Sequence, residues 1–464
     1  MTTSTNQQSL SHAIEQLVER LHNLSNERDA TTSRVRRIEI KIDLIDPLAW
    51  LNAQPDGYKT YWRSRDATFE MAGLGVIDII AINDAPDFDH VQTHIAGNLS
   101  GTSPAVRYYG GLRFDPSLIA DKRDSRWNSF GSCRLVLHRF ELVIDNGRGY
   151  LACNLFEDEQ TDKGLSGIIA ATRILVSDFD SPTTDPIKPT KREDFPNRDR
   201  WIDNVKQAIA SFDTGDSQKL VLARRASMQF ASGLRPWALL ERLRKQSENC
   251  FLFGVHPGPQ TSFVGATPER LFRREANQIF TEAMAGTRRR GNDTQTDREL
   301  SNELTTSEKE LWEHRLVVTG IEAGLGRICD RHTTFDGPLL FKLARIQHLQ
   351  TRFTGHLKPT INEFQIISAL HPSAAVGGYP VETAPALLHQ FEPFDRGWYA
   401  GQVGWIGADS AEFAVAIRSA LLSDTRLDLF SGAGIVRDSQ PETEWDEIEA
   451  KIGQFLSLTN GPQS

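Results

Sequence analysis

SEKELWEHRLVVTGIEAGL, residues 307–325, is the stretch around which the rest of the chain is organised. Its apolar residues recur at helical spacing, which predicts an amphipathic helix. Glu310 and Glu313 are three residues apart, so both carboxylates lie on one face of that helix. The residues that form the apolar stripe are Leu311, Val318, Ile321 and Leu325.

A second acidic pair, Glu444 and Glu447, lies near the end of the chain in another helical pattern, PETEWDEIEAKIGQFL. If the two helices face each other, four carboxylates meet, which is unfavourable unless a cation lies between them. Ligation by oxygen alone suits a hard ion such as Mg²⁺, which is completed by water and substrate. The alternative interpretation, two solvated helix faces rich in Glu, stays open at this point.

Length and composition are those of a globular protein. The 464 residues suffice for two or three domains or one large α/β unit, and 39% hydrophobic residues can fill a sizeable core. No apolar run approaches the roughly 20 residues that a membrane span needs. The N-terminal residues lack a basic segment followed by an apolar one, so we expect no secretory signal and no membrane partner.

The cysteines and the net charge indicate the cellular compartment and the kind of partner. The four cysteines have no CxxC spacing and are expected to be reduced thiols in a cytoplasmic protein. A net charge of −9 without a long basic block argues against nucleic acid as a partner. An anionic substrate must therefore be attracted by local cations.

Strand patterns dominate the first 180 residues. RRIEIKIDLI, residues 36–45, alternates strictly, and Asp145-Asn146-Gly147 predicts a hairpin turn between strands Arg134–Val143 and Gly149–Asn154. Ser177–Pro196 is rich in proline and predicts a linker.

We therefore expect an N-terminal α+β lobe over residues 1–195 and a catalytic region over residues 196–464, both within one structural unit. The second region adds strands at Lys219–Phe230, Glu412–Leu422 and Arg426–Gly432, and no internal repeat is evident in the sequence. The expected fold class is α+β, a large two-lobed sandwich of mainly antiparallel sheets with flanking helices.

Lys219 opens the apolar strand KLVLARRASMQF and shares a face with Val221 and Ala223. Desolvation on such a face favours the neutral amine, which can act as a base. A lysine that extends into solvent from the end of a strand is the alternative.

Glu269 follows a strand in GATPERL, where Thr267 could cap a short helix with Pro268 at its first position. It is either a surface carboxylate favoured by the helix dipole or a proton donor whose pKa is raised by enclosure.

Candidate anion contacts lie further along the chain. Arg418 is flanked by apolar residues in FAVAIRSALL, where a guanidinium is costly unless it meets a carboxylate. Tyr399 could add a hydroxyl, and Gly432 and Gly434 in SGAG could bring backbone N–H groups close to an anion. Other candidates are Thr287, which precedes a basic run that we interpret as a solvated loop, and His348, which could equally be structural.

Taken together, these segments resemble the chorismate-utilising enzymes, the family of isochorismate, salicylate, anthranilate and aminodeoxychorismate synthases. The resemblance covers residues 201–460 almost continuously and in the order of the family. Three segments of the first half, YWRSRD, YYGGLRFD and SCRLVLHRFEL, resemble the isochorismate synthases of menaquinone or phylloquinone biosynthesis. The matching segments of the second half are KLVLARR, FVGATPERLF, AGTRRRG, SEKELWEHRLVV, QHLQTRFTG, LHPSAAVGGYP, WYAGQVGW, FAVAIRSALL, LFSGAGIV and ETEWDEIEAK.

The resemblance implies roles for the acidic pairs and for the substrate. Glu313 and Glu447 would ligate Mg²⁺, with Glu310 and Glu444 holding its waters, and the ion would bind the ring carboxylate of chorismate. The enolpyruvyl carboxylate would be held by Arg418, Tyr399 and the amides around Gly432 and Gly434.

The resemblance also implies the chemistry. Lys219 would activate a water that attacks ring carbon 2, and Glu269 would protonate the hydroxyl that leaves carbon 4. Thr287 and His348 would line the pocket. Ammonia-using members of the family carry Gln where this chain has Lys219.

Alternatives remain open at this level. A salicylate synthase would share the lysine and then eliminate pyruvate, and a non-catalytic relative would bind chorismate without turnover. The expected oligomeric state is a monomer or weak homodimer. Whether the product enters quinone, siderophore or salicylate synthesis is open.

Overall fold

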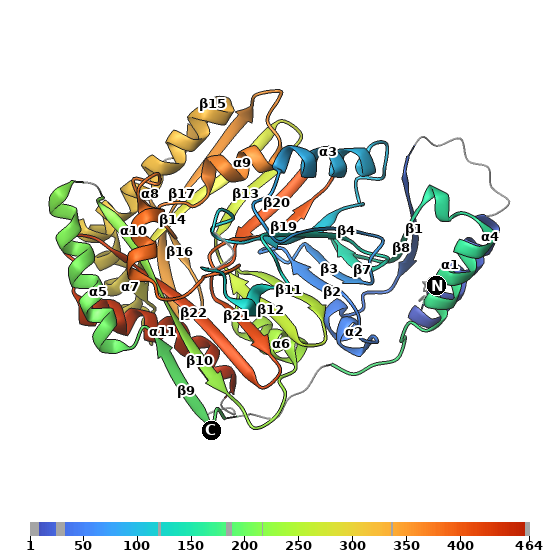
Figure 1. The fold of residues 1–464 in the computed structure, drawn as a ribbon, viewed down its shortest axis with the longest axis horizontal. Helices are drawn as coiled ribbons and strands as arrows, with labels where there is room; N and C mark the ends of the chain where they lie inside the picture. Colours follow the sequence, from blue (N-terminus) through green and yellow to red (C-terminus); the bar gives the residue numbers. More distant parts are fainter. Residues whose placement is uncertain are drawn as a thin grey trace.

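The computed structural model describes residues 9–24, 33–118, 122–181, 188–215, 217–335 and 337–459. Two large sheets face each other with helices outside them, and the described pairings between strands are all antiparallel (Figure 1). The expected α+β sandwich is confirmed. The helices are α1 (Leu10–Asn23), α2 (Pro47–Ala53), α3 (Phe88–Leu99), α4 (Asp162–Arg173), α5 (Arg198–Ser211), α6 (Pro236–Gln246), α7 (Thr294–Thr306), α8 (Glu308–Ile328), α9 (Glu363–Leu370), α10 (Ala384–Phe391) and α11 (Pro441–Thr459).

The larger sheet has 12 strands. In spatial order they are β1 (Val35–Ile42), β8 (Arg148–Phe156), β7 (Phe140–Asp145), β3 (Phe69–Leu74), β2 (Lys59–Arg63), β11 (Phe251–Gly258), β12 (Thr261–Thr267), β21 (Ser419–Ser423), β22 (Arg426–Ile435), β10 (Lys219–Gln229) and β18 (Gly378–Tyr379), with β9 (Lys191–Phe195) also paired to β10.

The smaller sheet has 10 strands. Their order is β15 (Cys329–Thr334), β17 (Ile346–Leu357), β14 (Gln278–Arg289), β13 (Arg270–Glu275), β20 (Ser410–Val415), β19 (Gln402–Ile406), β5 (Tyr108–Leu112), β6 (Cys133–Leu137) and β4 (Asp78–Ile82), with β16 (Leu339–Lys342) also paired to β17.

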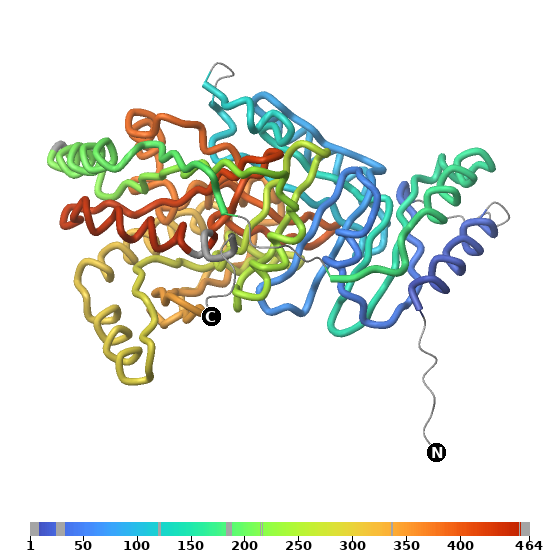
Figure 2. The backbone as a smooth tube through the Cα atoms, turned by 90° about the horizontal axis from the view of Figure 1, so that it is seen from below, coloured from blue at the N-terminus to red at the C-terminus, as the bar shows by residue number. Residues whose placement is uncertain are grey.

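Both sheets continue across the two halves of the chain. The halves meet where β2 pairs with β11 and where β5 pairs with β19. Figure 2 shows the first half, blue to cyan, beside the second half, green to red, along the long axis of the molecule. The predicted linker partly lies outside the described residues, at 182–187, and its last part is strand β9, paired with β10.

The fold repeats although the sequence shows no repeat. Outward from the β2–β11 contact, the larger sheet runs β2, β3, β7, β8, β1 on one side and β11, β12, β21, β22, β10 on the other. The smaller sheet likewise runs β5, β6, β4 against β19, β20, β13. The second half differs by a long insertion between β13 and β19, which contains β14, α8 and β17.

The chain passes from one sheet to the other at equivalent places in each half. Two predicted strands were wrong for this reason. Arg134–Val143 divides into β6 and β7, and Glu412–Leu422 divides into β20 and β21, each pair lying in different sheets. An apolar run shows that a segment is buried but not which sheet it joins. The polar residues at the passages, His138-Arg139 and Arg418, were therefore predicted to be part of continuous strands.

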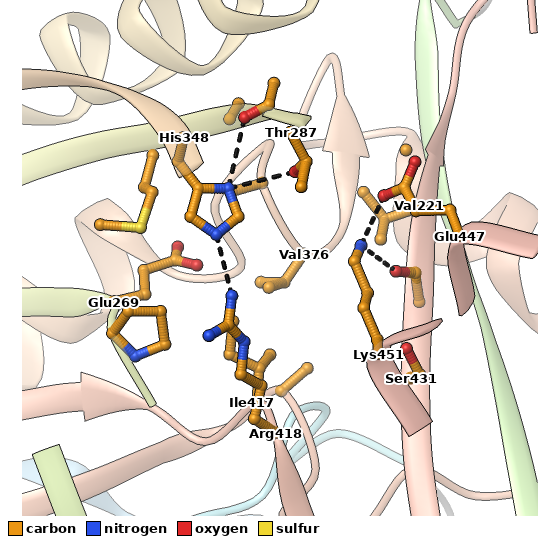
Figure 3. A pocket seen from close by; sticks show the side chains of 18 of the residues that line it. Val221, Glu269, Thr287, His348, Val376, Ile417, Arg418, Ser431, Glu447 and Lys451 are labelled. Carbon is orange, nitrogen blue, oxygen red and sulfur yellow. Dashed lines mark hydrogen bonds and ion pairs between the residues drawn. The ribbon is translucent and has the colours of Figure 1, made fainter. Parts of the chain in front are cut away.

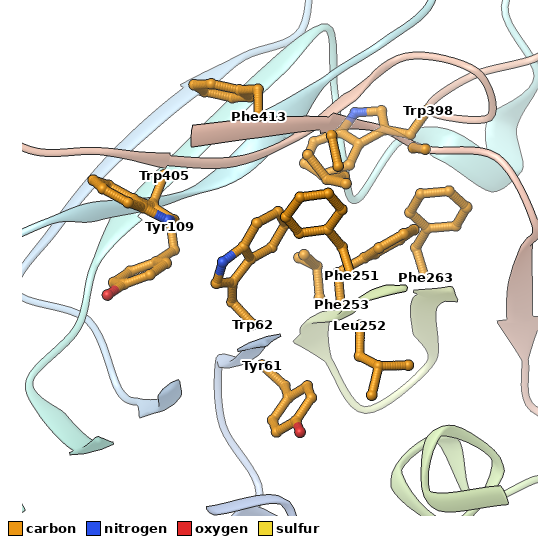
Figure 4. Packing of buried hydrophobic residues seen from close by; sticks show 14 of the residues in the cluster. Tyr61, Trp62, Tyr109, Phe251, Leu252, Phe253, Phe263, Trp398, Trp405 and Phe413 are labelled. Carbon is orange, nitrogen blue, oxygen red and sulfur yellow. The ribbon is translucent and has the colours of Figure 1, made fainter. Parts of the chain in front are cut away.

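Aromatic side chains fill the space between the sheets where the halves meet. Figure 4 shows Trp62, Phe251 and Phe263 of the larger sheet facing Trp398 and Trp405. The rings of Trp62 and Phe251, one from each half, have centroids 5.4 Å apart. Burial of such large apolar groups joins the two halves through one core.

Among the described residues, no helix combines the length and apolar character that crossing a membrane requires.

Candidate active site

A cavity opens in the second half, between the two sheets and beside α8 and α11. It holds about 1040 Å³ of space, including its mouth. Of the residues predicted for the site, all but Lys219 line this cavity. They are Glu269, Thr287, Glu310, Glu313, His348, Tyr399, Arg418, Gly432, Gly434, Glu444 and Glu447.

The two acidic helices converge on the cavity as predicted. Ser307 caps α8, its hydroxyl accepting from the N–H of Glu310, and the buried stripe of α8 begins at Glu310 and His314. Glu313 and Glu447 both line the cavity although they are far apart in sequence. The carboxylates therefore do not lie on separate solvated surfaces.

Each of the four carboxylates contacts a cation. Among the described residues, no group of three or more acidic, histidine or cysteine side chains is close enough to form a ready-made metal cage. The pairs and their N–O distances are Arg288–Glu310 at 2.8 Å, Lys219–Glu313 at 2.9 Å, Lys309–Glu444 at 2.9 Å and Lys451–Glu447 at 2.7 Å.

The pKa directions show that the carboxylates still repel one another. Burial and the charge of Glu313 raise the pKa of Glu310, and burial and the charge of Glu447 raise the pKa of Glu444. Burial opposes ionisation of Glu447 too, but Lys451 lowers its pKa overall. Oxygen donors that repel one another are the ligands that a hard divalent cation fits.

Lys219 lies behind the wall of the cavity. Its side chain is 1% exposed, and its ammonium contacts Glu313 rather than open space. Gly434 permits this approach, because a Cβ there would lie 2.3 Å from Glu313 Oε1 and 2.9 Å from Lys219 Cε. The lysine is thus desolvated as expected, but it reaches the cavity only past Glu313.

Glu269 lies in the passage from β12 to β13. The predicted short helix at Pro268 is wrong, because the chain continues directly into β13. The backbone of Glu269 is held on both sides: its N–H donates to Thr267 Oγ1, and its C=O accepts from the N–H of Val415 at 3.0 Å. Burial, assisted by the charge of Glu282, raises the pKa of Glu269 to about 8. The side chain is therefore a neutral acid at pH 7 that is able to donate a proton.

Arg418 lies in the neighbouring passage, from β20 to β21, and not within a strand as predicted. Its φ is 49°, and its C=O accepts from the N–H of Ala266 at 3.1 Å. The two passages lie side by side, so Arg418 and Glu269 enter the same cavity.

His348 holds the guanidinium of Arg418. Figure 3 shows Glu269, His348 and Arg418 on one side of the cavity, with Glu447 and Lys451 across from them. Arg418 Nη2 donates to His348 Nε2 at 2.8 Å, and burial together with Arg418 lowers the pKa of His348 well below its ordinary range. The ring is therefore neutral, with its proton assigned to Nδ1 facing Thr287 Oγ1 and Gly286 O.

A β-bulge in β14 positions Thr287. Gly286 has a φ of 78°, which suits glycine, and the register of β14 with β17 shifts there. The turned backbone lets the N–H of Thr287 donate to Glu310 Oε2 at 3.1 Å. The basic run after Thr287 is not the solvated loop that was predicted: Arg288 pairs with Glu310, and Arg290 pairs with Asp297.

Tyr399 closes the cavity near strand β22. Its ring stacks on Phe430 with centroids 5.2 Å apart, and burial raises the pKa of its hydroxyl. A Cβ on Gly432 would lie 3.2 Å from that hydroxyl. Glycine at this position therefore allows the hydroxyl of Tyr399 to lie close to the backbone of β22.

Sequence reasoning missed the three other cations that contact the carboxylates. Lys451 lines the cavity, contacting Glu447 and donating to Gly432 O at 3.0 Å. Its spacing of four residues from Glu447 was a usable signal, since such residues share a helix face. Lys309 and Arg288 gave no such signal, because their partners lie on other elements.

Comparisons with known proteins agree with this geometry. The chain is 32% identical to isochorismate synthase 2, chloroplastic, from Arabidopsis thaliana, over 96% of this chain and 84% of that protein. It is also 32% identical to the salicylate biosynthesis isochorismate synthase of Pseudomonas aeruginosa, over 91% of this chain and 90% of that protein.

A solved structure matches the whole fold. The menaquinone-specific isochorismate synthase MenF from Escherichia coli superposes with a TM-score of 0.86 at 28% identity, covering 98% of this chain and 100% of that one. The family model of the chorismate binding enzymes matches residues 17–460. The chain belongs to the family of chorismate binding enzymes.

Proposed function

We propose that this chain is an isochorismate synthase, an isomerase that converts chorismate to isochorismate. The observation that carries the proposal is the meeting, in one cavity, of the neutral acid Glu269, the guanidinium of Arg418 and the two acidic pairs, one of which contacts Lys219 through Glu313. Relatives named isochorismate synthase, matched over almost the full chain, support the same activity.

Mg²⁺ is the cofactor that the donor set favours. Glu313 and Glu447 would hold it, with Glu310 and Glu444 of the same cavity holding its waters, and hard carboxylate oxygens suit this ion. When bound, the ion would supply positive charge to the ring carboxylate of chorismate.

Arg418 would bind the enolpyruvyl carboxylate. Its guanidinium is oriented by the neutral ring of His348, which leaves the remaining N–H groups for a bidentate contact with an anion. Tyr399 and the backbone N–H groups near Gly432 and Gly434 would complete this contact. The product-forming carbons would then lie between Glu269 and the wall formed by Glu313.

In its neutral form, Lys219 would take a proton from a water that attacks ring carbon 2. A new C–O bond forms at carbon 2, the double bonds shift toward carbon 4, and the C–O bond at carbon 4 breaks. Glu269 would donate its proton to the departing hydroxyl, so one water enters and one leaves. Since the reaction only moves a hydroxyl, we expect a readily reversible equilibrium.

The test is product analysis. Purified protein with chorismate and Mg²⁺ should yield isochorismate by chromatography, and Lys219→Ala should abolish its formation. Absence of conversion by the wild type would refute the proposal. Salicylate and pyruvate in place of isochorismate would instead identify a salicylate synthase, and tight chorismate binding without product would identify a non-catalytic relative. A product that serves menaquinone biosynthesis would match the relative MenF from Escherichia coli.

A further inference from the structure

A charged cluster lies directly behind Glu269, outside the cavity wall. Arg65 is in the turn between β2 and β3, Glu282 is on β14 and Gln350 is on β17. Glu282 and Gln350 are buried, and the side chain of Arg65 is 13% exposed. Glu282 is two residues from Met284 on β14, and Gln350 is two residues from His348 on β17. Because side chains two residues apart point to the same face of a sheet, both lie on the face that lines the cavity, next to a cavity residue.

The cluster contacts both peptide groups that flank Glu269. Arg65 Nη1 donates to the C=O of Pro268 at 2.9 Å. Arg65 also makes a two-pronged contact with the carboxylate of Glu282, in which Nη2 donates to Oε2 at 3.0 Å. Glu282 Oε1 in turn accepts from the N–H of Arg270 at 3.2 Å. The residue before Glu269 and the residue after it are therefore tied to one ion pair.

Neighbouring groups hold the ion pair itself in place. The guanidinium of Arg65 lies over the rings of Phe251 and Phe341, 5.6 Å and 5.1 Å from their centroids. Gln350 Nε2 donates to Glu282 Oε2 at 2.7 Å, and Arg352 Nε donates to Gln350 Oε1 at 3.2 Å, which orients the amide. Each acceptor of Glu282 is used, which is what a buried carboxylate requires.

The cluster joins the first half of the chain to the reacting groups of the second. Arg65 belongs to YWRSRD, and no cavity residue comes from the first half in the described structure. A buried ion pair is a weak source of stability, since desolvation offsets the attraction of its charges. The ion pair contacts the peptide group before the proposed acid and the one after it, so a role in positioning that acid fits the contacts better.

We propose that Arg65, acting through Glu282, is a positioning residue that holds the backbone of Glu269 so that its carboxyl meets the leaving hydroxyl. This inference rests on the proposed function, in which Glu269 is the acid.

Charge gives the cluster a second effect on Glu269. The charged groups that act on it are Glu282 from β14, Lys219 from β10, Arg418 from the β20–β21 passage and Lys451 from α11, while His348 on β17 is neutral. After burial, the charge of Glu282 contributes most to raising the pKa of Glu269. Removing that charge lowers the pKa of Glu269, so the acid loses its proton at lower pH.

The experiment compares four variants of the full-length protein with Mg²⁺ and chorismate. Arg65→Ala should lower kcat by about 10- to 100-fold with KM within about threefold, because a small displacement of a reacting group costs that much. Arg65→Lys should recover part of the loss, since an ammonium reaches one acceptor but not both. Arg63→Ala is the matched control, since Arg63 lies two residues earlier and only approaches Glu70 at 4.0 Å. Glu282→Gln should move the alkaline decline of kcat to lower pH.

The outcomes separate a positioning role from a structural one. Folded Arg65→Ala with kcat within about threefold of the wild type would overturn the proposal, as would an equal loss in Arg63→Ala. If Arg65→Ala does not fold, Glu282→Gln provides the test. An unchanged kcat together with an unchanged alkaline decline in Glu282→Gln would overturn the proposal. Failure of the proposed function is distinguishable, because the wild type itself would then make no isochorismate.

Discussion

Glu269→Gln tests the assignment of the acid through both activity and stability. The substitution keeps the shape of the side chain and removes its proton. General acid catalysis typically contributes about 10²- to 10⁴-fold, so kcat should fall by that factor while chorismate still binds. Retention of near-normal kcat would remove Glu269 as the acid. For the wild type we expect kcat to fall as pH rises through about 8, the pKa of the buried carboxyl.

The same variant should gain stability at alkaline pH. The folded protein holds the carboxyl proton of Glu269 more tightly than the unfolded chain does, because burial raises the pKa from 4.5 to about 8. Its contribution to the free energy of unfolding is therefore present below pH 4.5 and is lost as pH rises toward 8. At about 1.36 kcal/mol per pKa unit, the loss is at most about 5 kcal/mol, reduced by whatever water reaches the group. Gln has no proton to lose and escapes this penalty.

Urea denaturation of Mg²⁺-free protein at pH 5.5 and pH 8.5 measures this difference. The unfolding free energy of Glu269→Gln should rise relative to the wild type between the two pH values. Glu70→Gln is a control for removing a buried carboxyl, since burial also raises the pKa of Glu70, which accepts from Tyr61 at 2.6 Å. It should shift the pH dependence of stability in the same direction but leave kcat near normal, because Glu70 does not line the cavity. Identical pH dependence of wild type and Glu269→Gln would refute the reasoning.

Further predictions concern the metal, the anion clamp and one glycine. Glu313→Gln and Glu447→Gln should each abolish turnover and lower the affinity for Mg²⁺, measured by calorimetry, by at least about 10- to 100-fold. A variant that stays active at low Mg²⁺ would contradict the ligand assignment. Arg418→Lys should raise KM by about 10- to 100-fold with smaller loss of kcat, because a bidentate contact worth about 1.5–3 kcal/mol becomes a point charge; an unchanged KM would remove Arg418 as the clamp. Gly434→Ala should lower kcat by about 10²-fold in a folded protein, since its Cβ would lie 2.3 Å from Glu313 Oε1, and normal turnover would show that the carboxylate has room to move.

Much of the candidate site was predictable because its sequence signals lie within short segments. Glu310 and Glu313 share a helix face by their spacing alone, and the apolar surroundings of Lys219 and Arg418 indicated that both charges were buried. The alternating strand predicted at residues 36–45 is observed as β1, which ends at Ile42, so the exposed Leu44 lies beyond it. This strand and the Asn146-Gly147 turn were predictable for the same reason: their signals lie within a few residues.

The positions at which the chain passes from one sheet to the other were not predictable. Glu269 and Arg418 both lie in such passages, and their flanking runs are apolar on either side of the break, so a helix start and an unbroken strand were predicted instead. The pairing of each carboxylate with a cation, such as Arg288 with Glu310, also depends on strands and helices far apart in sequence.

By itself, then, the sequence determined which residue types were available and which local faces they share, because periodicity and capping act over one or two turns. Only the tertiary structure decided that α8 and α11 open onto one cavity, that Lys219 is screened from it by Glu313, and that Arg65 of the first half contacts the peptide group before Glu269. Those contacts follow from sheet order and from the burial of one shared core, and both are properties of the whole chain.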